Sequence, residues 1–279
     1  MILGIDVGGS TTKIIGLENG KPVGMLQVRA ADQVTSMYGA IGNLLREHEI
    51  GLERVSSIAL TGVGASFIDE QIYGIETCKV NEFQAIGYGA LHLSGLDEAL
   101  VVSMGTGTAL VRAAKDGVTR VGGSGVGGGA IIGLASQMIG KSDVDAILAL
   151  AESGSVENVD LSVRDITGSE IPLLAPNLTA ANFGKIKSTA SESDLALGII
   201  NMVFETIGML AVLTLRNDTI RDVVMTGTLA TFPQLGPMLA TFSDIFELRF
   251  TIPPDAVFAT ALGAALISPD SPPGGSVRD

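Results

Sequence analysis

The sequence predicts an α/β protein of two related lobes, each with a mixed β-sheet, that face each other across a cleft. Three observations carry this prediction. Residues 5–11 contain the end of a buried strand and a glycine turn that leads into a second strand. A hairpin of similar design recurs at residues 102–108. The order of strands and helices also begins again after about residue 96. In this alignment Ser103 takes the place of Asp6, so only the first lobe keeps an acidic residue at the strand end.

The first half alternates short apolar runs with helical patterns. Runs of β-forming residues bounded by glycine and polar residues predict five strands. These are residues 2–7, 12–17, 22–28, 55–60 and 76–80. Apolar side chains at helical spacing predict a helix over residues 33–47, and a second helix is expected over residues 82–92.

The second half repeats this order and adds a longer connection. Strands are predicted at residues 99–103, 109–114, 118–121, 222–225 and 246–252. Helices are predicted up to residue 139 and at residues 143–151, 193–216, 234–242 and 255–266. The connection at residues 152–191 is polar and irregular. The lobes are therefore expected at residues 1–95 and 96–267, and the tail at residues 268–279, rich in Pro, Gly and Ser, is expected to be disordered.

The helix expected at residues 193–216 is apolar over more than one face. A helix that is apolar nearly all round lies in a core or in an interface. Both interpretations stay open, and the interface of a homodimer is one of them.

Composition argues against several classes of function. The chain has 279 residues and a net charge of −13, so nucleic acid is not an expected partner, because phosphate backbones need a basic face. Cys78 is the only cysteine, so neither a disulfide within the chain nor a cysteine-rich metal site is expected. The start of the chain does not resemble a signal peptide, and no run of about 18 apolar residues occurs. We therefore expect a cytoplasmic protein that does not enter a membrane.

The first glycine hairpin combines two features of a nucleotide site. The turn at Gly8 and Gly9 offers a concave set of backbone N–H donors that suits phosphate. Asp6 at the strand end can hold Mg²⁺, which binds through one or two carboxylates plus substrate phosphates. The hairpin therefore suggests ATP chemistry, and the alternative is an ordinary hairpin with an exposed Asp.

A glycine-rich segment at residues 121–134 leads into a helix. Residues 123–128 match G-x-G-x-x-G, but no strand ending in an acid follows at the distance that a dinucleotide site needs. The free N–H groups and the dipole of this helix N-terminus favour an anion, and close packing of the glycines against a neighbouring strand can hold at the same time. Residues 226–228, between a strand and a helix, could contact the adenosine of a nucleotide.

Two residues are candidates for proton transfer and for charge stabilisation. Glu82 follows Asn81, which fits a helix N-cap, and only two histidines, neither within a motif, compete with it as a general base. The alternative is that Glu82 only complements the helix dipole. Arg120, at a strand end before the glycine-rich segment, could neutralise a transferring phosphoryl group, or could be a surface residue paired with an acid. Weaker candidates for this role are Lys13, Arg112 and Arg164.

Seven motifs occur along the chain in a characteristic order. They are GIDVGGSTTK at residues 4–13, EFQA at 82–85, MGTGT at 104–108, RVGG at 120–123, GGGAIIG at 127–133, DLSVRD at 160–165 and LTAANFG at 178–184. With them the chain resembles the type II pantothenate kinases, members of the actin, sugar-kinase and heat-shock-chaperone ATPase superfamily. The first motif is shared across the superfamily, and the others in this order are specific to the kinase class. The resemblance covers nearly the whole chain except the tail.

The resemblance implies two actin-like (ribonuclease H-like) lobes with an ATP cleft between them. It also implies ATP-dependent phosphorylation of pantothenate to 4′-phosphopantothenate, the first step of coenzyme A biosynthesis. Glu82 would be the catalytic base, Arg120 the anion-stabilising arginine, and Asp6 would serve Mg²⁺ through water. Thr106 would lie near pantothenate together with Glu82 and Arg120. The implied ATP-binding residues are Asp6, Val7, Gly8, Gly9, Ser10, Thr11, Thr12, Lys13, Thr106, Gly128, Gly129, Ala130, Ile131, Ile132, Gly227 and Thr228. The family forms homodimers, and coenzyme A or its thioesters are further candidate ligands.

One residue departs from the family pattern, and three alternative functions stay open. Some family members carry a hydroxyl residue where this chain has Ala109, near the substrate or coenzyme A ligand. The first alternative is a kinase of the same fold for a sugar or amino sugar, although such kinases usually place a catalytic Asp in the central region. The second is a nucleotide-gated binding protein of actin or chaperone type, for which the chain is short. The third is an acyl-coenzyme A sensor without activity.

Overall fold

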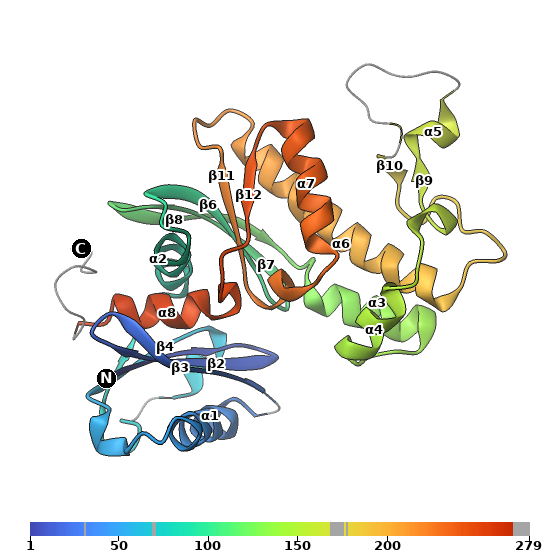
Figure 1. Cartoon of the computed structure of the whole chain (residues 1–279). Coiled ribbons are helices and arrows are strands. Elements are labelled where there is room, and N and C mark those ends of the chain that lie inside the picture. Colours follow the sequence, from blue (N-terminus) through green and yellow to red (C-terminus); the bar gives the residue numbers. More distant parts are fainter. Residues whose placement is uncertain (31, 69–70, 168–175, 177, 270–279) are drawn as a thin grey trace.

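Two mixed five-stranded β-sheets of the same topology form the two halves of the computed structural model (Figure 1). The structure describes residues 1–30, 32–68, 71–167, 176 and 178–269. The first sheet has the strand order β3-β2-β1-β4-β5, and the second has the order β8-β7-β6-β11-β12. In each sheet the first three strands along the chain are antiparallel, and the last two run parallel to the central strand. The predicted internal repeat is therefore present in the strand order.

The first half places its core between the sheet and one helix. The strands are β1 (Ile2–Val7), β2 (Thr11–Glu18), β3 (Lys21–Arg29), β4 (Ser57–Thr61) and β5 (Glu76–Lys79), and the helix is α1 (Gln33–Glu47). The carboxylate of Asp32 caps α1 by accepting a hydrogen bond from the backbone N–H of Thr35 at 2.7 Å. The apolar face of α1, with Met37, Ile41 and Leu44, packs against the sheet in a buried core.

The second half buries a larger core on one face of its sheet. Its strands are β6 (Glu98–Met104), β7 (Thr108–Ala114), β8 (Gly117–Ser124), β11 (Asp222–Thr226) and β12 (Arg249–Thr251). The helices on this face are α3 (Gly128–Ile139), α4 (Val144–Ala151), α6 (Glu192–Leu215) and α7 (Leu235–Phe246). Side chains of these helices pack with β6 and β11 in one cluster of apolar residues. Among the described residues, α6 alone has the length and composition to cross a membrane, contrary to the expectation that no such run occurs, but half of its apolar stretch is buried inside the protein.

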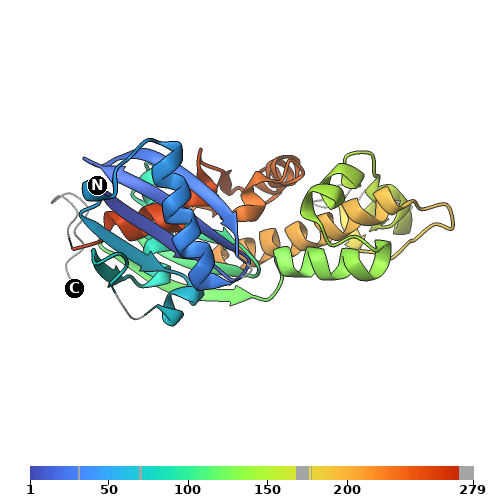
Figure 2. The same cartoon turned by 90° about the horizontal axis from the view of Figure 1, so that it is seen from below.

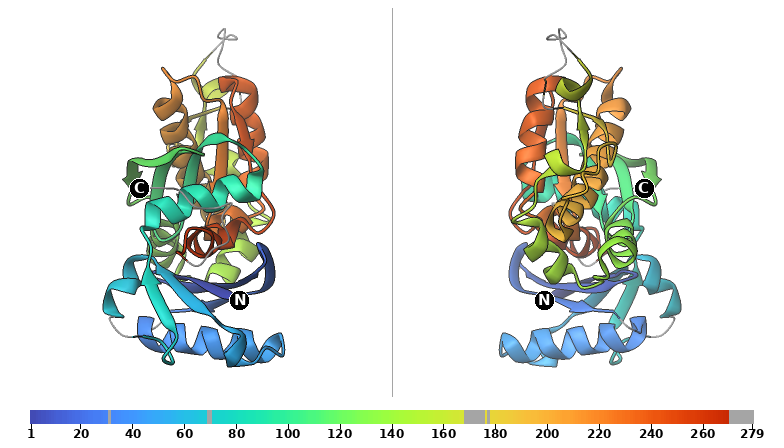
Figure 3. Two further views of the ribbon diagram at one scale, coloured as in Figure 1. Left: turned by 90° about the vertical axis from the view of Figure 1, so that its left-hand side faces the viewer. Right: turned by 90° about the vertical axis from the view of Figure 1, so that its right-hand side faces the viewer.

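Two helices between the sheets join the halves (Figure 3). Helix α2 (Glu82–Ser94) follows the first sheet in sequence but packs on the second, in a cluster that includes Ile86, Val101 and Val111. Helix α8 (Ala259–Leu266) follows the second sheet and packs on the first. The division of the chain near residue 95 therefore stays a prediction, because each of these helices covers the sheet of the other half.

The crossing of α2 and α8 depends on two glycines. A Cβ atom at Gly89 would lie 1.8 Å from the carbonyl oxygen of Ala259, and a Cβ atom at Gly263 would lie 1.8 Å from the carbonyl oxygen of Ala85. Only glycine allows this backbone approach. The two helices thus hold the halves at a fixed, short distance beside the cleft.

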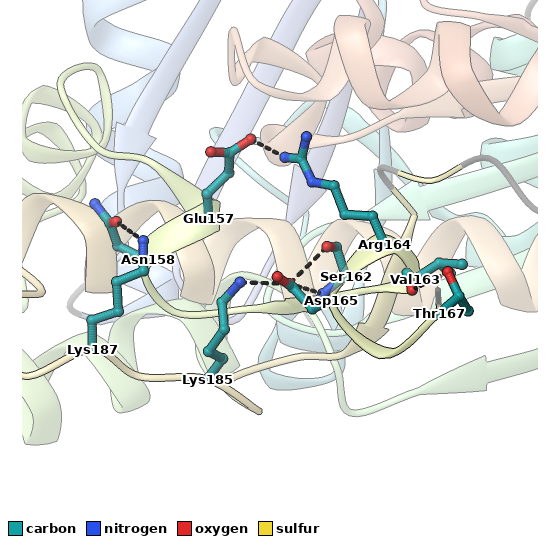
Figure 4. A network of polar contacts seen from close by, with 9 residues as sticks. All are labelled: Glu157, Asn158, Ser162, Val163, Arg164, Asp165, Thr167, Lys185 and Lys187. Atoms are coloured by element: carbon teal, nitrogen blue, oxygen red, sulfur yellow. Dashed lines mark hydrogen bonds and ion pairs between the residues drawn. The ribbon is translucent and has the colours of Figure 1, made fainter. Parts of the chain in front are cut away.

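The connection between α4 and α6 projects away from both sheets (Figure 2). We expected it to be irregular, but it contains β9 (Leu161–Ser162), α5 (Val163–Ile166) and β10 (Thr179–Ala181). Figure 4 shows the polar contacts that order it, including Lys185 with Asp165 at 2.5 Å and Lys187 with Asn158 at 2.9 Å. The carboxylate of Glu205 on α6 also accepts hydrogen bonds from Thr179 and Asn182. These polar contacts join residues 20 to 29 positions apart in the chain, so no local sequence pattern reveals them.

The remaining predicted helices and strands are present, with small changes at their ends. The strand expected at residues 246–252 is shorter, because Phe246 ends α7 and only Arg249–Thr251 pair with β11. The last helix is preceded by a 3₁₀ turn, Ala256–Phe258. Ser268 is buried, and residues 270–279 of the predicted tail lie outside the described residues.

Candidate active site

A cavity of about 620 Å³ opens between the halves at the two glycine hairpins. Its walls come from the β1–β2 and β6–β7 hairpins, the start of α2, the end of β8, the start of α3 and the turn after β11. Most of the residues predicted to bind ATP or substrate line it. These are Asp6, Gly8, Gly9, Ser10, Thr11, Lys13, Glu82, Thr106, Arg120, Gly128, Gly129, Ile131, Ile132, Gly227 and Thr228.

Three predicted ATP-binding residues, Val7, Thr12 and Ala130, do not line the cavity, so their part in nucleotide binding stays a prediction. Val7 and Thr12 are buried and lie opposite each other on β1 and β2. Because side chains alternate between the two faces of a strand, the neighbours Asp6 and Lys13 face the cavity instead. Ala130 packs against the larger core from the first turn of α3.

The first hairpin presents a buried ion pair to the cavity. Asp6 and Lys13 lie directly opposite each other on β1 and β2, and Lys13 Nζ is 3.3 Å from Asp6 Oδ2. Both residues are buried. A Cβ atom at Gly62, which has a positive φ of 87°, would lie 2.6 Å from Asp6 Oδ1, so the chain turns closely around this carboxylate. The alternative of an exposed Asp in an ordinary hairpin is therefore wrong.

Glu82 is the first residue of α2 and lines the same cavity. The side chain of Asn81 caps the helix by accepting from the backbone N–H groups of Phe83 and Gln84, at 3.0 and 3.2 Å. Burial raises the pKa of Glu82 above 4.5, the nearby charge of Asp6 raises it further, and Lys13 acts in the opposite direction. A raised pKa makes the carboxylate a stronger base, as general base catalysis requires.

Arg120 contributes a positive charge to the lining of the cavity. Arg112 and Arg164, the weaker candidates, form ion pairs with Asp218 and Glu157. Within the described part of the chain, no ion pair with an acidic residue engages Arg120. Its charge is therefore available to an anionic ligand.

The second hairpin offers hydroxyls and backbone rather than charge. Thr106 Oγ1 lies 2.9 Å from Ser10 Oγ, so the tips of the two hairpins touch across the cavity. The backbone N–H groups of Gly128 and Gly129 donate to the carbonyl oxygens of Gly105 and Thr106, each at 2.9 Å. The expectation that these first amides of α3 are free for an anion is therefore wrong, and the close packing of glycines against a neighbouring strand is what the segment achieves.

Several lining residues were missed by the sequence analysis. Val63 follows Gly62 as Thr228 follows Gly227, and both glycines have a φ of 87°. Thr228 was predicted to line the site, and Val63 is its counterpart in the first half. The internal repeat could therefore have identified Val63. Other missed residues, such as Val257 and Thr260, come from the far end of the chain, where no motif marks them.

The residues present fit a magnesium ion that arrives with phosphates. Asp6 supplies one buried carboxylate at the cavity. No group of three or more His, Cys, Asp or Glu residues suited to a metal occurs in the part of the chain that is described. Mg²⁺ keeps several waters and is held by one or two carboxylates plus substrate phosphates. The donor set therefore suits a metal bound together with a nucleotide.

Sequence comparisons connect the chain to one family. The family model named Fumble matches residues 97–241. A type II pantothenate kinase from Staphylococcus saprophyticus subsp. saprophyticus is 30% identical over 237 residues, which are 82% of this chain and 85% of the relative. A type II pantothenate kinase from Bacillus cereus (strain G9842) is 25% identical over 274 residues, 95% of this chain and 97% of the relative.

Solved structures share the fold at low sequence identity. The (R)-2-hydroxyglutaryl-CoA dehydratase component A from Acidaminococcus fermentans has a TM-score of 0.67 at 18% identity, covering 95% of each chain. The activator of the 2-hydroxyisocaproyl-CoA dehydratase from Clostridium difficile, with bound ADPNP, has a TM-score of 0.66 at 15% identity, covering 96% of this chain and 93% of the activator. A ROK hexokinase from Thermus thermophilus has a TM-score of 0.53 at 14% identity, covering 95% of this chain and 97% of the hexokinase. These neighbours confirm the predicted actin-like fold. The sequence relatives and the family model lead to the conclusion that the chain belongs to the type II pantothenate kinase family.

Proposed function

We propose that the chain phosphorylates pantothenate with ATP to form 4′-phosphopantothenate, the first step of coenzyme A biosynthesis. The name shared by the curated relatives supports the substrate and the reaction. The observation that carries the proposal is that Asp6, Glu82 and Arg120, from three separate parts of the chain, line one cavity. Phosphoryl transfer to an alcohol needs a base for the hydroxyl proton and positive charge on the transferring group, which Glu82 and Arg120 can supply.

In the proposed reaction Glu82 accepts the proton of the primary hydroxyl of pantothenate. The hydroxyl oxygen forms a bond to the γ-phosphorus, the bond from that phosphorus to the bridging oxygen breaks, and ADP leaves. The raised pKa of Glu82 supports this role, because a base works best when its pKa approaches the working pH. Arg120 stabilises the negative charge of the transferring group, and positioning supplies much of the rate.

We assign the nucleotide to the two hairpins. Ser10, Thr11 and Thr106 offer hydroxyls to the phosphates, and the turn of Gly227 and Thr228 is the proposed adenosine contact. Asp6 would hold Mg²⁺ through water, and the ion would neutralise charge on the phosphates. Lys13, paired with Asp6, keeps a positive charge beside the same phosphates.

The assembly and the cellular location are part of the proposal. The exposed Leu213 on α6, an apolar helix that is only half buried in this chain, supports a homodimer with this helix at the interface. A cytoplasmic enzyme agrees with the half burial of α6, the one helix of the described residues that is long and apolar enough to span a membrane. Coenzyme A or its thioesters are proposed as ligands of the acceptor side of the cavity, beside Ala109.

A coupled assay for ADP release tests the proposal directly. With ATP and Mg²⁺, we expect turnover with pantothenate and none above background with glucose or N-acetylglucosamine. Addition of coenzyme A tests the regulatory ligand in the same assay. Turnover of a sugar without turnover of pantothenate would overturn the proposal, and ATP hydrolysis that ignores every small acceptor would favour a nucleotide-gated binding protein.

A further inference from the structure

Phe83 lies next to the candidate base but outside the cavity lining. Its ring centroid is 5.2 Å from the central guanidinium carbon of Arg120. A cation within about 6 Å of an aromatic ring centroid is attracted by the ring's negative face. Phe83 also packs against the apolar cluster of α2, β6 and β7, and this packing restricts the position of the ring.

The strand that carries Arg120 turns this side chain towards α2. Counting from the hairpin turn, Val118 pairs with Ala113 and Arg120 pairs with Val111. Ala113 and Val111 are buried against α2, and residues opposite each other on antiparallel strands share a face. Arg120 therefore lies on the α2 face, over the ring of Phe83.

A β-bulge follows Arg120 directly on β8. The register of β7 and β8 shifts by one residue between Val111 and Leu110, so Val121 is the extra residue before Gly122. Bulges bend a strand and re-aim side chains, often beside active sites. Beyond the bulge, a Cβ atom at Gly123 would lie 3.6 Å from Arg120 Nη2, so the guanidinium reaches along a strand that carries no side chain there.

From these contacts we infer that Phe83 is a positioning residue, which holds the guanidinium of Arg120 at the reaction centre by a cation–π contact. The inference rests on the proposed function. Since Glu82 and Phe83 are consecutive at the start of α2, one helix end places both the base and the charge that stabilises the transferring group. With no acidic partner among the described residues, Arg120 depends on the ring for its orientation while its charge stays available to the ligand.

The test uses Phe83→Leu, which keeps an apolar side chain and removes the ring, and Phe83→Tyr, which keeps the ring. We expect Phe83→Leu to lower kcat/KM for pantothenate by about three- to thirty-fold and Phe83→Tyr to restore it. In an Arg120→Gln background, Phe83→Leu should change kcat/KM by less than about two-fold. Leu91→Val, in the same apolar cluster and away from the cavity, is the matched control and should leave kcat/KM near the wild-type value.

An NMR measurement keeps the inference separate from the proposed function. The Nε–H resonance of Arg120 should carry an upfield ring-current shift that disappears in Phe83→Leu and persists in Phe83→Tyr and Leu91→Val. If the shift is present but wild-type protein does not phosphorylate pantothenate, the proposed function fails and the contact stands. An equal kinetic loss with and without Arg120, or no loss at all, overturns the positioning role.

Discussion

The two glycine hairpins share a backbone design and differ in charge. In the first, Asp6 faces Lys13 across the strands and lies beside Thr61 of the parallel neighbour β4. In the second, Ser103 faces Ala109 and lies beside Thr226 of β11. Each neighbouring strand is followed by a glycine with a φ of 87°, Gly62 after β4 and Gly227 after β11. The backbone arrangement of hairpin and neighbouring glycine is therefore common to both lobes. At the compared positions, the buried charges, Asp6 and Lys13, belong to the first lobe alone.

The same contrast appears in the segments that connect each sheet to the helix that follows it, α2 after the first sheet and α8 after the second. Glu82 begins α2 after β5 and lines the cavity. After β12, the chain reaches α8 through Asp255 and Ala256, which do not line it. The two halves thus provide matching backbone walls, and the acidic residues at the cavity come from the first half, whereas Arg120 comes from the second.

The largest effect should come from the acid that has no counterpart in the second lobe. Glu82→Gln keeps the size of the side chain and removes the proton acceptor. We expect kcat for pantothenate phosphorylation to fall by about 10²- to 10⁴-fold. Nucleotide affinity, measured by calorimetry, should stay within about two-fold. The matched control is Asp255→Asn at the equivalent turn, which should leave kcat unchanged, and near-normal turnover by Glu82→Gln would remove Glu82 as the base.

The next largest effect should come from a substitution in the first hairpin, whereas the equivalent substitution in the second should have little effect. Asp6→Asn removes the buried carboxylate, so we expect kcat to fall by about 10²- to 10³-fold and the Mg²⁺ concentration for half-maximal rate to rise. Ser103→Ala at the equivalent position should change kcat by less than about five-fold. Comparable losses from the two variants in a Mg²⁺ titration would contradict the assignment of charge to one lobe.

A third prediction concerns the crossing of α2 and α8, to which each half contributes one helix. A methyl group at Gly89 or at Gly263 meets a backbone carbonyl at 1.8 Å, so either alanine variant should lose about 3 kcal/mol of unfolding free energy, the upper part of the overpacking range. Gly39→Ala on the exposed face of α1 is the control, since nothing lies within 4 Å of its Cβ position. It should gain about 0.5 kcal/mol. Urea unfolding monitored by circular dichroism measures all three, and unequal losses at the two crossing glycines would show that the lobes depend on the crossing differently.

The smallest effect is a shift in pH dependence. Burial first, and then Asp6, raise the pKa of Glu82, so its protonation should lower kcat/KM on the acid side at a pH above the ordinary value of 4.5. Lys13→Met removes the charge that lowers this pKa and should move the acid limb to higher pH. Asp6→Asn removes a charge that raises it and should move the limb to lower pH. Profiles of log kcat/KM against pH measure the shifts, and movement in the same direction in both variants would contradict the charge arrangement.

Much of the fold follows from local sequence patterns. The helix at Gln33–Glu47 was predicted with its observed bounds, because the helical spacing of its apolar residues is a local signal. The repeat of the hairpins was visible in the chain, and it predicted the shared strand order. The small strands β9 and β10 were not predicted, since polar contacts between distant segments order them.

The site was predictable in its charged residues and less so in its shape. Asp6, Glu82 and Arg120 each stand beside a glycine turn or a helix start, which is a local signal. The use of the Gly128 and Gly129 amides by carbonyls of the second hairpin is a contact between distant segments that no motif reveals. The ring of Phe83 under Arg120 was missed for the same reason, as the pairing of β7 with β8 determines it.

A crystal structure with Mg²⁺ and a non-hydrolysable ATP analogue tests the central claim most directly. We predict that the triphosphate lies between the Gly8–Gly9 turn and the Thr106 turn, with the metal on the Asp6 side and the γ-phosphate directed towards Glu82 and Arg120. Phosphates bound away from both hairpins, or a metal held on the Ser103 side, would contradict the account.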